Sequence, residues 1–272
     1  MVNMEIWFPH VLDSAFGKTH QVGVLYAFSA DGALQFSFFC LFHEANFNTD
    51  TAHLCIKCTR IKVMLISLLS ILISFVYVIL AISIHEFAHA YTADRLGDPT
   101  ARSQGRLTLN PLAHIDLIGT IILPLGLMLL SGGNFAYGWG KPTPFDPYNL
   151  KHPRRDVGLI SFAGPVSNLL LASIVALAIH FLPYSFSIFL IPFVYINVGL
   201  AIFNLIPVGP LDGQKILFGL LPRDLAYEYQ SIMNRYGTLI LLFLILPIFG
   251  STAPISAIIY PLLNLITHLL LP

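Results

Sequence analysis

Residues 63–89 read VMLISLLSILISFVYVILAISIHEFAH, an apolar run that ends in two histidines and a glutamate. The apolar part is long enough to cross a bilayer as a helix, which takes about 20 residues. His85 and His89 are four residues apart, so a helix places them on one face, where they could bind one Zn²⁺. Glu86 is on the same turn and is placed to act on a water molecule as general base. The stretch predicts a hydrolytic metal site within a membrane helix.

The composition is that of an integral membrane protein. The chain is 56% hydrophobic and 10% charged, whereas an average soluble domain carries about 25% charged residues. Further apolar segments occur at residues 115–130, 157–182, 186–207, 237–249 and 253–271. We therefore expect an α-helical, multi-span bundle of five or six apolar segments in a lipid bilayer. The net charge of zero gives no support for a nucleic-acid partner, and the sequence sets no oligomeric state.

Residues 1–61 differ from the rest of the chain and are predicted to be a poorly patterned N-terminal extension. Their longest apolar stretch, Val22 to Phe42, is interrupted by polar residues and makes a poor span. Translation that starts near Met64 is one interpretation of this segment, and a small variable extension is the other. The membrane-embedded domain is accordingly expected at residues 62–272.

Basic residues are concentrated in loops 94–106, 141–156 and 215–235. Basic loops normally face the cytoplasm, and all three can do so only if segment 115–130 does not cross fully. This topology predicts a cell-membrane protein whose active site faces the cytoplasmic side.

Two stretches between the apolar segments are candidates for strands. Arg102–Asn110 and Asn134–Lys141 alternate weakly and are bounded by Gly and Pro, which favours a small β-sheet at the membrane surface. Irregular loops are the alternative. An edge strand there could pair with an extended substrate peptide.

A catalytic zinc ion usually has three protein ligands and one open position. No Glu occurs between Glu86 and Glu228, so the third ligand is expected to be Asp or a distant His. Asp212 is the best candidate because it follows segment 186–207 and returns to the membrane side that holds the histidines. Its Pro- and Gly-rich flank interrupts the helix, and a broken backbone at membrane depth is tolerated where it lines a polar cavity. If Asp212 is not the ligand, the remaining candidates are Asp94, Asp116 and His114.

Three motifs resemble those of the site-2 proteases, a family of intramembrane zinc metalloproteases. They are His85-Glu86-x-x-His89, Gly164-Pro165-x-x-Asn168, and Asn204-x-x-Pro207 followed by Asp212-Gly213. The resemblance covers residues 62–250 and implies that His85, His89 and Asp212 bind zinc while Glu86 activates water.

The resemblance also implies supporting roles for two asparagines. Asn204 would lie near the metal and donate a hydrogen bond to the scissile carbonyl or its oxyanion. Asn168 follows Pro165 near the start of segment 157–182, where Pro suits the first helical turn. Asn168 either supports the site or contacts substrate, and structural packing is an equal alternative.

The predicted function is hydrolysis of a peptide bond within or near a transmembrane helix of a membrane-protein or peptide substrate, with one Zn²⁺ per chain. The alternative is a non-enzymatic metal-binding membrane scaffold or an ion transporter, since intramembrane His and Asp also suit ion pathways. Transporters commonly show internal repeats, and none is evident in this sequence.

Overall fold

The structure is a computed structural model that describes residues 23–28, 34–39, 49–130, 138–246 and 253–272. The chain divides into two units, residues 1–67 and 68–272, and the helix α1 contributes to both. The elements in chain order are β1 (Gly23–Phe28), β2 (Leu34–Phe39), α1 (Thr49–Leu96), α2 (Thr100–Ser103), η1 (Pro111–Ala113), η2 (Leu117–Ile122), α3 (Leu123–Leu130), η3 (Pro147–Asn149), α4 (Pro153–Ile179), α5 (Tyr184–Leu205), α6 (Asp212–Leu220), α7 (Arg223–Ile245) and α8 (Ser256–Leu270).

Strands occur in a different part of the chain from the one predicted. In the first unit, β1 and β2 pair antiparallel, with Gly23 opposite Phe39 and Phe28 opposite Leu34. The prediction of a strand over Arg102–Asn110 was wrong, because α2 and irregular turns occupy that range. Of the second predicted strand, only residues 138–141 are described, and they are not part of a β-strand. Residues 134–137 lie outside the described part.

Within the described residues, three helical segments are long and apolar enough to span a membrane: Leu68–Leu96, Pro153–Ile179 and Tyr184–Leu205. Two shorter apolar helices, Leu117–Leu129 and Ser256–Leu270, accompany them. The fifth predicted segment, 237–249, begins inside α7, whose first half is polar. The helical, multi-span class is thus confirmed, but the number of full-length spans in the described chain is smaller than the number of apolar segments.

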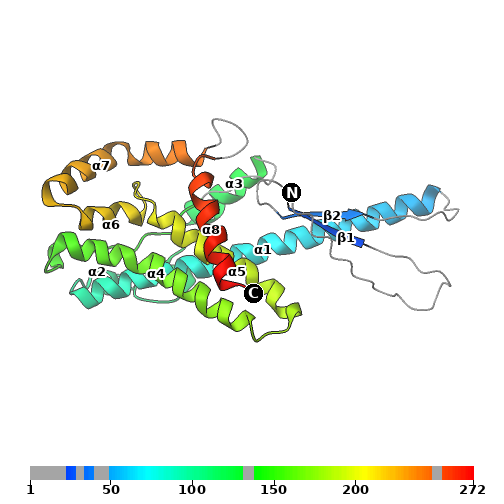
Figure 1. Ribbon diagram of the computed structural model, residues 1–272, viewed down its shortest axis with the longest axis horizontal. Helices are drawn as coiled ribbons and strands as arrows, with labels where there is room; N and C mark the ends of the chain where they lie inside the picture. Colours follow the sequence, from blue (N-terminus) through cyan, green and yellow to red (C-terminus); the bar gives the residue numbers. More distant parts are fainter. Residues whose placement is uncertain (1–22, 29–33, 40–48, 131–137, 247–252) are drawn as a thin grey trace. The chain divides into compact units, whose positions relative to one another are not determined.

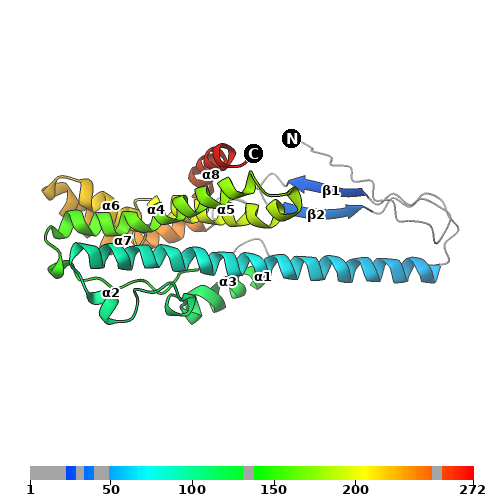
Figure 2. The same cartoon turned by 90° about the horizontal axis from the view of Figure 1, so that it is seen from below.

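The helices α4 and α5 form an antiparallel pair whose contact is made of small and β-branched side chains (Figures 1 and 2). Ala172 and Ala176 of α4 pack with Val194 and Val198 of α5, and each is at most 1% exposed. Small side chains let two helices approach closely in a bilayer. Partly buried residues of α8, among them Leu263, cover the same cluster.

A second apolar cluster fixes the turn between α5 and α6. Ile206 and Leu211, at either end of this turn, pack with Leu241 and Ile245 of α7. Gly237 of α7 also lies so near the turn that a Cβ added there would be 3.0 Å from backbone atoms of Gly209. The start of α6, and with it Asp212, is therefore held by packing from α7.

The start of α4 differs from the expected one. The helix begins at Pro153, where the Asp156 carboxylate accepts a hydrogen bond from the His152 amide over 2.9 Å. Pro165 consequently lies inside the helix, and the prediction that it occupies the first turn was wrong. The expected boundary followed the apolar run and omitted the charged turn that caps the helix.

Candidate metal centre

The helix α1 brings His85 and His89 together on one face. Their ring centroids are 4.5 Å apart, and the residues are 5% and 7% exposed. Earlier in the same helix, Leu68, Leu72 and Val76 are largely exposed, as lipid-facing positions would be. The polar pair thus lies on the buried part of an otherwise apolar helix, as the four-residue spacing predicted.

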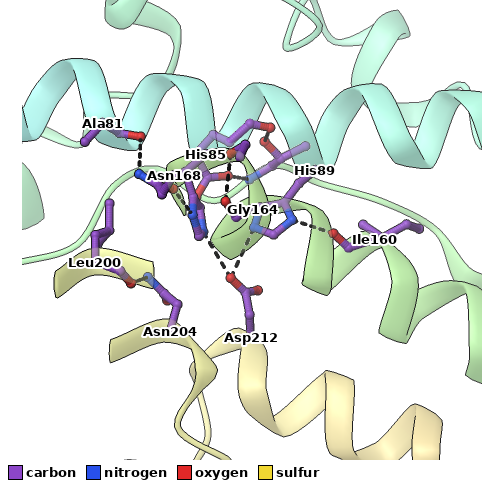
Figure 3. A network of polar contacts seen from close by, with 12 residues as sticks. Ala81, His85, His89, Ile160, Gly164, Asn168, Leu200, Asn204 and Asp212 are labelled. Atoms are coloured by element: carbon purple, nitrogen blue, oxygen red, sulfur yellow. Dashed lines mark hydrogen bonds and ion pairs between the residues drawn. The ribbon is translucent and has the colours of Figure 1, made fainter. Parts of the chain in front are cut away.

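The outer nitrogen of each imidazole has a hydrogen-bond acceptor. Nδ1 of His89 donates to the carbonyl oxygen of Ile160 over 2.7 Å, and Nδ1 of His85 lies 2.8 Å from Oδ1 of Asn168 (Figure 3). Asn168 uses its amide hydrogens on the Ala81 carbonyl (3.3 Å) and on Oδ1 of Asn197 (2.9 Å), so its own oxygen accepts. Both histidines therefore carry hydrogen on Nδ1 and present the Nε2 lone pair to the centre of the site.

Asp212, the first residue of α6, meets these two lone pairs. Its Oδ2 atom is 3.0 Å from Nε2 of His85 and 3.1 Å from Nε2 of His89 (Figure 3). A carboxylate binds a metal in its ionised form.

This donor set fits a zinc ion. Ligand atoms of His85, His89 and Asp212 all lie within 4.8 Å of one another, and all three residues are buried. Ligands about 2.0–2.2 Å from a tetrahedral zinc ion are roughly 3.3 Å apart, close to the two distances above. Three electron-pair donors that converge in a buried space repel one another unless a cation lies between them. The residues could hold one metal ion.

Gly164 makes room for both imidazole rings. A Cβ at this position would lie 2.5 Å from Cε1 and Nε2 of His89 and 2.6 Å from Cε1 of His85. Real Cβ contacts are never so short, so any larger residue would displace both rings. The glycine of the Gly164-Pro165 motif is therefore required by the contact between α4 and α1.

Glu86 is held by an extended segment, residues 141–146. Its Oε2 atom accepts a hydrogen bond from the Thr143 amide over 2.7 Å, and the Thr143 hydroxyl donates to the Glu86 carbonyl over 3.0 Å. Pro142 and Pro144, on either side of Thr143, favour the extended backbone that this double contact needs. The carboxylate is thus oriented from outside α1.

The far end of the segment is fixed by Asp98, which is fully buried. Its carboxylate accepts hydrogen bonds from the Asp146 amide (2.7 Å), from Nδ2 of Asn149 (2.8 Å) and from Thr100. Burial raises the pKa of the Asp98 carboxyl, but the hydrogen bonds from Thr100, Asn149 and Asp146 together lower it below its ordinary value. Asp98 is therefore an ionised anchor between the end of α1 and the segment that holds Glu86.

A cavity of about 200 Å³ opens beside the three candidate ligands. Glu86 and Asn204 line it, as do Trp139, Phe145 and Lys215. The Asn204 side chain donates to the Leu200 carbonyl over 3.0 Å (Figure 3), which leaves its second amide hydrogen for a ligand. Asn168 is fully buried behind His85 and does not line this cavity.

The alternative ligands are engaged elsewhere. Nε2 of His114 lies 2.8 Å from the Thr108 carbonyl, Asp116 accepts from the Gly119 amide, and Asp94 pairs with Arg102. Within the described residues, the group of His85, His89 and Asp212 is the one that could hold a metal. The structure thus brings together the residues that the sequence favoured.

Several contributors to the site were not predicted. The Ile160 carbonyl has no signal in a sequence, because any residue carries one. Thr143 becomes relevant only once the chain folds back onto α1. Asn197 did have a signal, since a buried amide in an apolar span usually has a structural or functional role.

Comparison with known proteins agrees with this geometry. The chain is 37% identical over 201 residues to the "Putative zinc metalloprotease YwhC" of Bacillus subtilis, an alignment that covers 68% of this chain and 83% of that one. The chain belongs to peptidase family M50. The family model itself, "Peptidase family M50", matches residues 180–244. No solved structure matches.

A second relative, the "Putative zinc metalloprotease Rip2" of Mycolicibacterium smegmatis, is 31% identical over 177 residues, which cover 62% of this chain and 64% of that protein. The resemblance to the site-2 protease family is thereby confirmed, with zinc as the cofactor. Together with three apolar helices, family membership makes the chain an integral membrane metalloprotease.

Proposed function

We propose that this M50 peptidase is of the site-2 type and hydrolyses a peptide bond within or near a transmembrane helix of a membrane-protein substrate. The proposal rests on one observation. His85 and His89, on a helix that is apolar enough to span a bilayer, converge with Asp212 of α6 beside Glu86. Intramembrane ionisable residues are costly and usually mark function.

In this proposal, His85, His89 and Asp212 hold one zinc ion per chain. Zinc, when bound, supplies Lewis acidity toward a peptide carbonyl and lowers the pKa of water to about 7. Asn168 and the Ile160 carbonyl set the orientation of the two imidazoles through the hydrogen bonds to Nδ1. Such outer partners fix the tautomer and increase the basicity of the ligand.

Glu86 acts as the general base in the proposed reaction. Its carboxylate takes a proton from water and later delivers it to the leaving amine. The Thr143 amide already occupies Oε2, so Oε1 is the oxygen available to the water. The free amide hydrogen of Asn204 is the proposed donor to the oxyanion.

The substrate backbone would bind as an extended strand beside the cavity. The Trp139 amide donates to the Gly119 carbonyl over 3.0 Å, and the Lys141 amide donates to the His114 carbonyl over 2.9 Å. The edge of the extended chain that carries these two amides is therefore already hydrogen-bonded. In an extended chain the intervening residues point their polar groups the opposite way. Gly138 and Gly140 line the cavity. Their backbone polar groups, on the opposite edge, are the ones we propose to pair with a substrate that has unwound from its helix.

We place the enzyme in the cell membrane with the site toward the cytoplasm. The metal centre lies near the C-terminal end of α1 and the N-terminal end of α4, where Arg95, Arg154 and Arg155 are located. Basic residues favour the cytoplasmic side. The lipid bilayer and a membrane-protein or peptide substrate are the proposed partners.

The test combines metal analysis with cleavage of membrane-helix substrates by the purified protein. Substitution of His85, His89 or Asp212 by Ala should reduce bound zinc sharply and abolish cleavage, whereas His180→Ala, at an exposed histidine just after the C-terminal end of α4, should retain both. Zinc binding without cleavage of any substrate by the wild-type protein would favour a metal-binding scaffold or a transporter instead.

A further inference from the structure

Two polar side chains in the cavity beside the metal centre have no role in the mechanism above. One is Ser161 of α4, which is 1% exposed and lines the cavity. Its Oγ atom has no hydrogen-bond partner among the described residues. Buried hydroxyl groups are nearly always hydrogen-bonded, so an unpaired one at a cavity wall indicates a missing ligand.

The second is Lys215, which lies one helical turn after Asp212 on α6. It is half-buried and is the one lysine or arginine among the described residues that line the cavity. Its Nζ atom lies 5.3 Å from the centre of the Phe145 ring, which also lines the cavity. No carboxylate of the described chain forms an ion pair with it.

The acidic groups of the cavity are already engaged. Asp212 contacts the two histidines, and Glu86 accepts from the Thr143 amide. A partly desolvated ammonium group without a counter-ion costs free energy, and an aromatic ring compensates for only part of that cost. A carboxylate supplied by a bound peptide would complete the site.

We propose that Lys215 recognises a carboxylate of the bound substrate and that the Ser161 hydroxyl forms a hydrogen bond with the same chain. The inference rests on the proposed function, because it assumes that a peptide enters the cavity. The carboxylate could be an acidic side chain beside the cut site, or the C-terminal carboxylate of the new product. Both have the same chemistry, and the experiment separates them.

The first arm compares transmembrane-helix peptides that differ only in one Glu or Gln, placed in turn at each position beside the cut site. The zinc-loaded wild-type enzyme should cleave the preferred Glu peptide about 10-fold better than its Gln partner, the value of one charge-assisted hydrogen bond. Lys215→Gln should abolish this ratio and Lys215→Glu should invert it toward a Lys-containing peptide. Lys151→Gln, which removes an exposed cation outside the cavity, should preserve the ratio.

The second arm measures binding of product peptides that end in a free carboxylate or in an amide. If the product terminus is the ligand, the wild-type protein should bind the free acid about 10-fold tighter and Lys215→Gln should not distinguish the two. Ser161→Ala should weaken binding of acid and amide peptides alike, and unchanged binding would remove Ser161 from the proposal.

Equal behaviour of the wild-type protein and Lys215→Gln in both arms would overturn the role of Lys215. Failure of the wild-type protein to cleave any peptide would instead contradict the proposed function. The binding arm would still decide whether Lys215 recognises a carboxylate, because it does not depend on turnover. Zinc content, measured in every variant, excludes an indirect effect through Asp212.

Discussion

Gly164→Ala is the substitution that tests the packing of the metal centre most sharply. The added Cβ would lie 2.5 Å from His89 and 2.6 Å from His85, whereas carbon atoms in ordinary contact are about 3.5–4.0 Å apart. Relief of both contacts requires the rings, or the helix α4, to move by about 1 Å. The methyl group thus acts on both candidate histidine ligands without removing either.

The size of the effect follows from the hydrogen bonds that hold the rings. A shift of this size would stretch the bonds from His89 to Ile160 (2.7 Å) and from His85 to Asn168 (2.8 Å). Loss of such outer partners typically lowers metal affinity by about 10–100-fold. Misplacement of a catalytic group by about 1 Å can lower the rate by about 100-fold. We therefore expect weaker zinc binding and a larger loss of cleavage.

The assay is competitive zinc titration against a chelator, carried out on the purified protein in detergent. Gly199→Ala is the matched control, because it is also a helical Gly-to-Ala change in a candidate span and its Cβ would meet no atom within 4 Å. Both variants gain about 1 kcal/mol of helix propensity, so propensity cancels in the comparison. Wild-type zinc affinity in Gly164→Ala would refute the close packing described above.

Three further outcomes are expected. Asn168→Ala should weaken zinc binding by about 10–100-fold because His85 loses its Nδ1 partner, whereas Ser173→Ala, an exposed position on the same helix, should not; equal affinities would contradict the orienting role. Asp98→Asn should lower the melting temperature at pH 7, since unsatisfied buried donors cost about 1–3 kcal/mol. The pKa of Asp98 is lowered in the fold, so the stabilising effect of its carboxylate is present above the unfolded pKa of about 4 and disappears as the pH falls through the folded pKa. Melting temperatures of the wild-type protein and the variant should therefore converge in acid. A chain that begins at Met64 should insert into membranes and keep its activity, and failure to insert at comparable expression would show that residues 1–61 are structural.

The residues proposed to hold the metal were predictable from the sequence because their chemistry is tied to local spacing. A four-residue interval on a helix predicts that His85 and His89 share a face, and the Pro-Gly flank and charge bias indicated Asp212. Asn168 could not be assigned in this way, since its role depends on how α4 packs against α1. The same holds for Thr143, whose two bonds to Glu86 form only when a loop more than 50 residues away folds back.

The errors have physical reasons as well. Alternation over Arg102–Asn110 favoured a strand, but α2 and a turn at Gly105, with φ of +66°, take up this segment. Pro165 was read as a helix start because Pro is common there, yet the helix tolerates it internally. The carbonyl that precedes such a proline by four residues has no helical partner, and at this site that residue is Ser161, which lines the cavity.

The most direct measurement of the central claim is cleavage by Glu86→Gln beside its zinc content. Gln preserves the size of the side chain and an oxygen for the Thr143 amide, but it cannot accept a proton from water as the carboxylate does. General acid–base catalysis contributes about 10²–10⁴-fold. We therefore expect a folded protein with one zinc ion per chain and a cleavage rate that is lowered by at least about 100-fold. Cleavage close to the wild-type rate by the zinc-loaded variant would contradict the metalloprotease mechanism.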